Sequence, residues 1–167
     1  AANAVAVSEL RRRKHRPFKP FAVMTLNDLS ASRFVRISEK ASKELHSPQA
    51  PIVLCPKTND ADRLLPGIAP ELNRIGIMMP YTPIHWLLFF EAIGRPEDPD
   101  WYKKECDLVL VMTSANAGGE PLVIGNDEAV QKLDGIADLF LTHNRDILIR
   151  CDDSVMQQRD QDVQLIR

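Results

Sequence analysis

The chain has 167 residues, of which 44% are hydrophobic and 26% are charged, and its formal net charge is −2 at pH 7. This length predicts a single domain, residues 1–167, that is large enough to bury a core. The composition is typical of a globular protein and excludes a disordered chain. A chain with this charge binds nucleic acids non-specifically only if its cations gather on one surface.

The cysteines argue against a disulfide framework and against a structural zinc site. Cys55, Cys106 and Cys151 are odd in number and far apart, and no Cys-x-x-Cys pair occurs. A reducing, cytoplasmic location therefore fits best. Cys151 has no His or Lys beside it that would activate a thiolate, so we expect it to be buried and unreactive. The longest apolar run, residues 86–90, is far too short to span a membrane, and residues 1–4 do not resemble a signal peptide.

Helices and short strands alternate in the first part of the chain. Asn3 is a suitable N-cap for the first helix, and Thr82 with Pro83 begins a later one. The later helix is apolar on nearly every face, so we expect it to be buried. Residues 57–63 are polar and are predicted to form a loop. The predicted helices span residues 4–14, 28–34, 38–46 and 84–93, and the predicted strands span residues 21–24, 51–55 and 75–79.

The second part of the chain is richer in strands. Residues 95–105 form an exposed connection, which Trp101 and Tyr102 are expected to anchor. Residues 108–112 are the clearest strand, and because they are apolar on both faces we expect a central position in the sheet. A helix with an Asx cap is predicted at residues 126–133, and short strands are predicted at residues 139–142, 147–150, 154–157 and 163–166. The order of elements predicts an α/β fold with a mixed parallel and antiparallel sheet.

A cation-rich stretch follows the first helix. Residues 11–13 load the last helical turn with positive charge, which suits the helix dipole, and we expect them to be solvated. Lys14, Arg16 and Lys19 differ, because Lys19 lies past the helix on a loop restricted by two prolines. Cations fixed in this way are what a phosphate or carboxylate site requires. At this point an anion site and a solvated helix end are equally good interpretations.

Two later stretches are further candidates. The strong strand leads into small and polar residues, 113–121, where a ligand can approach the backbone closely, and Ser114 and Asn116 would face it. The alternative is a plain loop, since Gly and Asn are turn formers. Neither a P-loop nor a dinucleotide-binding glycine pattern is present.

Further on, either Asp152 or Asp153 is a candidate ligand for Mg²⁺, and we favour Asp153; the alternative is an Asx turn.

Four segments, taken in order, carry a resemblance to a known family. They closely resemble the YrdC-like domain of the HypF-type carbamoyltransferases of nickel–iron hydrogenase maturation. The segments are Lys-His-Arg-Pro-x-Lys-Pro-x-Ala-Val-Met (14–24), Gly-Ile-Met-Met-Pro-Tyr-Thr-Pro-Ile-His (76–85), Val-Met-Thr-Ser-Ala-Asn-x-x-Gly-Glu-Pro (111–121) and His-Asn-Arg-Asp-Ile-x-x-Arg-Cys-Asp-Asp-Ser-Val (143–155).

The resemblance implies a twisted mixed sheet flanked by helices, and an ATP-dependent reaction. ATP and carbamate are joined as carbamoyl-adenylate with release of pyrophosphate, and Mg²⁺ is the metal cofactor. Lys14 and Arg16 take the catalytic role by binding the phosphates or the acyl carboxylate. Carbamate is itself the attacking group, so no nucleophilic side chain is expected. The residues implied for binding ATP and carbamate are Lys14, Arg16, Lys19, Thr113, Ser114, Asn116, Arg150 and Ser154.

The chain also departs from the family pattern. Gly118 stands where the family often has serine, so one hydroxyl donor is missing. Family members carry a strand and a Gly-rich turn before the first helix and continue past the position of Arg167, so we expect a piece of a longer chain. Its partners would then be the acylphosphatase, zinc-finger and carbamoyl-transfer domains of a HypF-type protein and a HypE-type acceptor. No membrane partner is expected.

Two alternatives stay open. A threonylcarbamoyl-AMP synthase for tRNA modification belongs to the same wider family and shares the K-x-R and T-S-x-N loops. A non-enzymatic module that binds double-stranded RNA through residues 11–19 is the other, and the overall acidity and the few aromatic residues in that stretch count against it.

Overall fold

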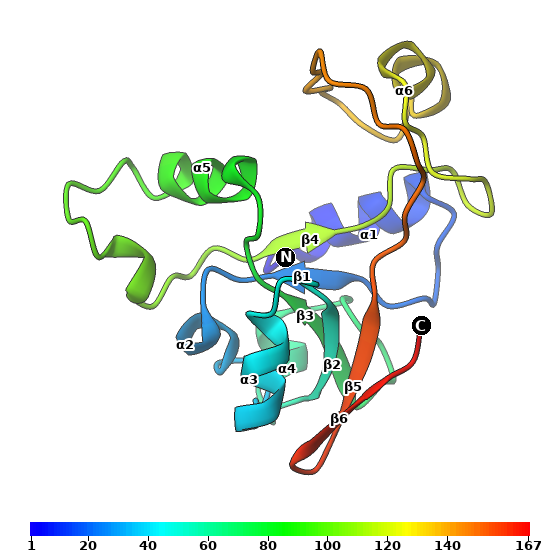
Figure 1. Cartoon of the computed structure of the whole chain (residues 1–167). Coiled ribbons are helices and arrows are strands. Elements are labelled where there is room, and N and C mark those ends of the chain that lie inside the picture. Colours follow the sequence, from blue (N-terminus) through cyan, green and yellow to red (C-terminus); the bar gives the residue numbers. More distant parts are fainter.

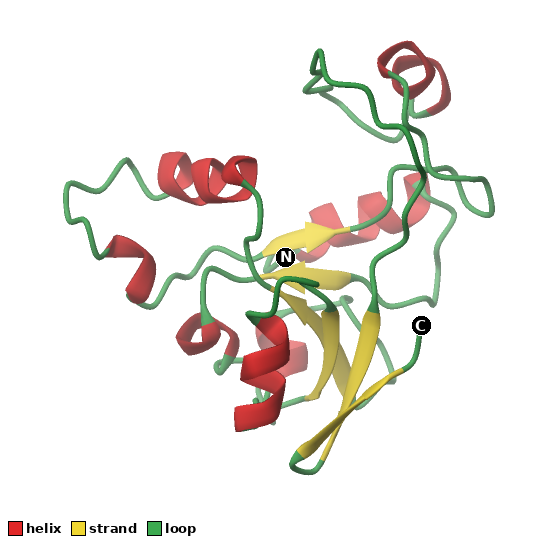
Figure 2. Cartoon of the chain, viewed as in Figure 1, coloured by secondary structure: helices red, strands yellow, loops and turns green.

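The computed structural model describes all residues from 1 to 167 and is built on one twisted sheet of six strands (Figures 1 and 2). The strands lie in the order β4-β1-β3-β2-β5-β6. The pairs β1–β3 and β2–β5 are parallel, and the other three pairs are antiparallel, so the predicted mixed sheet is confirmed. The strands are β1 (Ala22–Met24), β2 (Ile52–Pro56), β3 (Arg74–Met78), β4 (Leu110–Met112), β5 (Val155–Arg159) and β6 (Asp162–Leu165).

The helices are short, and side-chain capping explains where three of them begin. The side chains of Asn3, Asn27 and Ser38 accept hydrogen bonds from backbone amides at the starts of these helices, and the cap at Asn3 is as the sequence predicts. One short helix begins within the predicted loop 57–63 and was missed, because a single turn has no periodicity to detect. The helices are α1 (Ala4–Arg13), α2 (Asp28–Ala31), α3 (Glu39–Leu45), α4 (Ala61–Leu64), α5 (Pro83–Ala92), the 3₁₀ helix η1 (Trp101–Lys103) and α6 (Asn126–Lys132).

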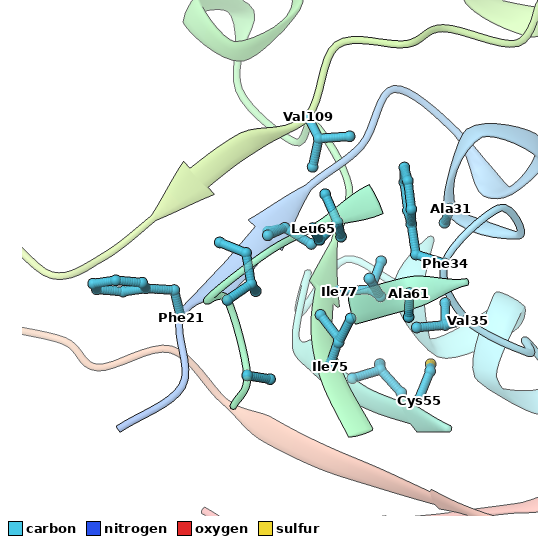
Figure 3. Close-up of a cluster of buried hydrophobic side chains, with 14 of the residues drawn as sticks. Phe21, Ala31, Phe34, Val35, Cys55, Ala61, Leu65, Ile75, Ile77 and Val109 are labelled. Atoms are coloured by element: carbon cyan, nitrogen blue, oxygen red, sulfur yellow. The ribbon is translucent and has the colours of Figure 1, made fainter. Parts of the chain in front are cut away.

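One face of the sheet carries the main core. Alternate strand residues such as Val23, Val53 and Ile77 point to this face and are fully buried. They pack against side chains from α1 and from the segment between β1 and β2, including Phe34 and Val35 (Figure 3). This face is therefore closed to ligands.

The opposite face carries a second, smaller cluster. This cluster, which includes Met24, Met78 and Phe89, lies where α5 packs on the sheet. Ala22 and Ile52 pack against it, and Gly76 is buried, so that a Cβ atom added there would lie 2.9 Å from Ile52 Cγ2. Gly76 thus makes room for the side chain of Ile52 from the neighbouring strand.

The position of β4 corrects the sequence prediction of a central strand. β4 pairs only with β1 and forms one edge of the sheet. Its residues are nevertheless apolar on both faces, because Val109 and Val111 pack in the main core whereas Leu110 and Met112 pack against the second cluster. A strand that is apolar on both faces has other side chains packed on both faces. This pattern does not show whether a neighbouring strand pairs with each of its two edges.

Helix α5 is also not buried as predicted. Its inner face contacts Trp101, whose ring centroid lies 6.3 Å from that of Trp86 and 5.5 Å from that of Phe90. Trp101 thereby anchors the connection 95–105, as expected. Its outer face carries Ile84, Leu87 and Leu88, which are all exposed. In Figure 1 α5 and the following connection extend away from the sheet, so only one side of the helix finds a packing partner.

The segment between β4 and β5 contains fewer regular elements than predicted. Residues 139–142 and 147–150 form no strands, and residues 141–150 are all exposed. Helix α6 follows Gly125 and has no side-chain cap; instead Asn126 donates a hydrogen bond from its side chain to the carbonyl oxygen of His143. These apolar runs have no neighbouring strand to pair with, and this part of the chain projects away from the sheet (Figure 1).

The three thiols are free, and they differ in exposure. Cys55 and Cys106 are buried, and burial raises the pKa of Cys55 to about 12, so it stays protonated at neutral pH. Cys151 is exposed, which corrects the expectation of a buried residue, because its segment has no packing partner.

No helix combines the length and the hydropathy needed to cross a membrane.

The two faces of α5 should respond differently to truncation. We expect Phe89→Ala to lower the free energy of unfolding by about 3–5 kcal/mol, because it empties a fully buried position. Leu88→Ala, on the outer face of the same helix, should cost less than about 0.5 kcal/mol. Urea denaturation of both variants measures the difference. Equal costs would contradict the exposed outer face.

Candidate functional site

The residue at the centre of the candidate site is Lys14. It is only 4% exposed, and its ammonium group donates hydrogen bonds to the carbonyl oxygens of Ser114 at 2.6 Å and Asn116 at 3.0 Å. A third, longer contact of 3.5 Å reaches the side-chain oxygen of Asn116. The structure therefore brings together two of the predicted stretches, which lie about a hundred residues apart in the sequence.

The sheet explains why these stretches meet. Helix α1 ends at Arg13, and the next residue, Lys14, donates its backbone amide to Leu10 at the helix end. The chain then turns at His15, which has a positive φ of 47°, and enters β1. Because β1 and β4 are antiparallel with Ala22 opposite Met112, the segment before β1 lies beside the segment after β4. The register of one strand pair thus fixes the site.

The cations at this end of the sheet have no acidic partners. Lys14, Arg16, Lys19 and Arg11 form no ion pair with any carboxylate. Burial, and secondarily the charge of Arg16, lower the pKa of Lys14, and burial together with the charge of Arg11 lowers the pKa of Arg16. Uncompensated positive charge that is partly desolvated favours a bound anion.

The loop after β4, residues 113–119, is shaped to expose backbone donors. The hydroxyl of Ser114 donates to the side-chain oxygen of Asn116 at 2.7 Å, and the Asn116 amide group donates to the carbonyl of Glu120 at 2.7 Å. These bonds close the loop on itself. The amides at positions 114, 115, 117, 118 and 119 donate to no acceptor within the chain. A curved run of free amides beside a lysine is a suitable receptor for phosphate oxygens.

Gly118 lies tightly against the other loop. A Cβ atom added there would come within 3.3 Å of the backbone oxygen of Lys14, which is closer than ordinary van der Waals contact. A serine at this position would therefore require the two loops to separate slightly. The glycine is compatible with a close approach of the two loops.

Arg16 and Thr113 contribute buried polar atoms that have no partner. The guanidinium of Arg16 turns back to donate to the carbonyl of Pro20 at 2.6 Å and lies 5.1 Å from the centre of the Phe21 ring. Its Nε atom and the Thr113 hydroxyl are buried without a hydrogen-bond partner. Unsatisfied buried donors are costly, so their presence here suits a site that a ligand or water completes. Lys19 is exposed, and its side chain contacts no acceptor.

The remaining predicted residues are not joined to Lys14 by any contact. Arg150 donates to the carbonyl of Leu122 at 2.5 Å and lies 3.9 Å from a carboxylate oxygen of Glu128. Ser154 accepts a bond on its backbone oxygen from the amide of Ile52, at the start of the β2–β5 pairing.

Asp153 is exposed, and no cluster of three or more His, Cys, Asp or Glu residues surrounds it or any other position. The pKa of Tyr81 is raised by burial and, less strongly, by the negative charge of Asp153. A single carboxylate is compatible with Mg²⁺ only if phosphate oxygens and water supply most of its ligands. The metal assignment to Asp153 therefore stays a prediction.

Two cavities lie away from Lys14 and the loop 113–119. One cavity of ≈ 590 Å³ lies beside α5 and η1 and is lined by Ile93, Trp101 and Leu108 among others. Another, of ≈ 300 Å³, lies between α1 and residues 66–70. Lys14 and the loop 113–119 line neither of them.

Sequence reasoning missed one residue near the site. Residues 11–13 were predicted to be solvated, which holds only for Arg12, whose partner is Glu9. Arg13 pairs with Glu9 and with Asp138, whereas Arg11 turns inward and binds backbone carbonyls. The spacing in the sequence could have indicated this, because Arg11 lies three residues before Lys14 and so shares its helix face.

Comparison with known proteins adds to this geometry. A family profile described as "Telomere recombination" (Sua5, YciO and YrdC) matches residues 1–167. The chain belongs to the Sua5/YciO/YrdC family. It is 54% identical over 157 residues to carbamoyltransferase HypF2 of Cupriavidus necator, a match that covers 94% of this chain and 20% of that protein. It is 46% identical over 157 residues to carbamoyltransferase HypF of Rhodobacter capsulatus, covering 94% of this chain and 19% of that protein. The chain thus spans about a fifth of the length of these relatives.

Solved structures of the family agree in fold. Full-length HypF in a phosphate- and nucleotide-bound form matches with a TM-score of 0.83 and 39% identity, over 100% of this chain and 24% of that one. Sua5 of P. abyssi with two substitutions matches with a TM-score of 0.74 and 19% identity, over 100% of this chain and 47% of that one. The second likeness concerns the fold alone. The predicted YrdC-like sheet flanked by helices is confirmed.

The contact between the two loops can be tested with a pair of lysine variants. Lys14→Met removes the donor to Ser114 and Asn116, and we expect it to lower the free energy of unfolding by about 1–3 kcal/mol. It should also speed hydrogen exchange at the amide of Val123, which is bonded to the carbonyl of Ala115. Lys19→Met, which removes an exposed cation, is the control and should change stability by less than about 0.5 kcal/mol. Unchanged exchange in Lys14→Met would show that the ammonium group does not hold the loop.

Proposed function

We propose that this chain binds ATP with its phosphates on the free amides of the loop 113–119, beside Lys14 and the neighbouring cations, and that it joins ATP to carbamate as carbamoyl-adenylate. The observation that carries the proposal is a set of cations without acidic partners beside backbone amides without acceptors. Such a surface neutralises a polyphosphate, and residues 113–119 leave its backbone open to close approach.

The chemistry needs positioned charge more than it needs a reactive side chain. A carbamate oxygen attacks the α-phosphorus, a new O–P bond forms, the bond between the α- and β-phosphates breaks, and pyrophosphate leaves with the electron pair. Two anions approach each other in this step. Lys14, Arg16 and Lys19 offset that repulsion, and the loop amides orient the phosphates. Mg²⁺, when bound to phosphate oxygens and to Asp153, would neutralise further charge.

The other predicted residues take supporting roles in this proposal. Thr113 and Ser114 contribute hydroxyl groups at the end of β4, and Asn116 holds their loop closed. Arg150 and Ser154 lie on the segment that leads into β5 and would meet the ligand from that side. No nucleophilic side chain is required, because carbamate itself attacks.

Similarity to the carbamoyltransferases supports the choice of acyl group. Relatives at 46% and 54% identity are named HypF carbamoyltransferases, and the full-length HypF structure at 39% identity is described as phosphate- and nucleotide-bound. We therefore infer a YrdC-like domain that acts in the cytoplasm within a HypF-type enzyme of hydrogenase maturation. Its partners would be the other domains of such an enzyme and a HypE-type acceptor.

Two other functions are less well supported. Threonylcarbamoyl-AMP synthesis rests on Sua5 structures at 17% and 19% identity, far below the HypF relatives. Binding of double-stranded RNA needs free cations on α1. Arg12 and Arg13 are instead paired with acidic residues, and Arg11 is committed to carbonyl groups. The ion pairs of Arg12 and Arg13 therefore offset part of the charge that an RNA phosphate would meet along this helix.

Calorimetry and a pyrophosphate assay test this function. With Mg²⁺ present, we expect ATP to bind, and Lys19→Ala or Ser114→Ala to weaken binding by about 3–30-fold. Lys19→Ala removes a cation near the phosphates, and Ser114→Ala removes the bond to Asn116 that closes the loop. Lys43→Ala, which removes a cation paired with Glu39 far from the site, is the control and should bind normally. Pyrophosphate should be released with carbamate as the acyl source, because carbamoyl phosphate must first lose its phosphate to give the attacking carboxylate. Release with threonine and bicarbonate alone would favour the synthase, and no ATP binding would overturn the proposal.

A further inference from the structure

Arg11 makes more hydrogen bonds than any other side chain near the site, and all of them go to backbone carbonyls. Its Nη1 atom donates to Arg16 at 2.8 Å, to Lys19 at 3.0 Å and to Pro17 at 3.2 Å. Its Nε and Nη2 atoms donate to Gly67 at 2.9 Å and 2.6 Å, and Nη2 also reaches Ile68 at 3.2 Å. One guanidinium group therefore joins the cationic loop to residues 67–68, which lie before β3.

A second contact ties the same group to the site. The Arg11 guanidinium carbon lies 4.7 Å from the centre of the Phe21 ring, and that of Arg16 lies 5.1 Å from the same centre. Phe21 is fully buried, and its amide donates to the carbonyl of Ile68 at 3.0 Å. The two arginines are thus held against one fixed ring, which sets where Arg16 can lie.

The charge of Arg11 is not used in an ion pair. Burial lowers its pKa, and no carboxylate contacts it. A cation that is partly buried without a carboxylate partner gains little stability from its charge. A planar group with five donors, in contrast, can satisfy several carbonyls at fixed angles, and lysine cannot reproduce that geometry.

We propose that Arg11 is a positioning residue for the anion site: it holds the backbone of residues 16–19 and so fixes Arg16 and Lys19 at a set place relative to Lys14. This inference rests on the proposed function for its effect on nucleotide affinity. The mechanical part, that Arg11 holds this loop, does not depend on it. Arg11 itself contacts no phosphate, because its donors are already occupied.

A charge-preserving substitution separates geometry from charge. Arg11→Lys keeps the positive charge but loses the fork of donors. Arg12→Lys, one residue further along, makes the same change at an exposed side chain that contacts only Glu9, and serves as the control. Both variants are made in the chain together with any sequence that flanks it in its gene. They are compared at a temperature where thermal unfolding shows both to be folded.

The expected result has two parts. Hydrogen exchange at the Phe21 amide should be faster in Arg11→Lys and unchanged in Arg12→Lys. The KM for ATP in pyrophosphate release should rise by at least about tenfold in Arg11→Lys while kcat stays within about threefold, since the loop is misplaced before the nucleotide binds. A general loss of stability would lower the amount of folded protein without moving the KM.

The outcomes are distinguishable. If the wild type turns over ATP and Arg11→Lys has the same KM and the same exchange at Phe21, the positioning role is wrong and the proposed function stands. If the wild type does not bind ATP, the proposed function is wrong, and exchange at Phe21 still decides whether Arg11 holds the loop. Faster exchange with an unchanged KM would overturn the link between this contact and the site.

Discussion

The structure depends on the contact between the ammonium group of Lys14 and the carbonyl oxygens of Ser114 and Asn116. This contact joins the end of α1 to the loop after β4, and it places a desolvated cation beside backbone amides that have no acceptor. A lysine that serves only solubility would be exposed. A lysine that is 4% exposed and bonded to three oxygens instead organises the surface around it. Its donors are already in use, so the free amides and the neighbouring cations are the groups that remain for a ligand.

Both faces of the sheet carry packed side chains, and the candidate site lies at the ends of its strands. The closed face holds the main core under α1–α4, and it makes the short strands rigid enough to fix their ends (Figure 3). The opposite face carries the second cluster around Met24, Met78 and Phe89, and Ile52 lies against Gly76 there. The cationic loop and the loop 113–119 meet where β1 begins and β4 ends. The candidate site is thus a consequence of the antiparallel register of β1 and β4.

Much of the fold and part of the site could be predicted from the sequence. The cap at Asn3 and the apolar runs of β1–β3 are local signals, so they were detected. The edge position of β4 and the exposed outer face of α5 depend on which other elements pack against these apolar surfaces. A local sequence pattern does not contain that information. The pairing of Lys14 with Ser114 and Asn116 was expected from resemblance. The inward turn of Arg11 was missed, because the carbonyls of Gly67 and Ile68 that it binds come from a distant segment.

The most direct test of this account follows the backbone amides of the loop 113–119 by NMR while ATP is added to the protein with Mg²⁺ present. The account predicts that the amides of Ala115, Ala117, Gly118 and Gly119 show the largest chemical-shift changes, because phosphate oxygens become their acceptors. It also predicts smaller shifts at the outer face of α5. If ATP binds and these loop amides do not move, the nucleotide phosphates lie elsewhere and the central claim is contradicted.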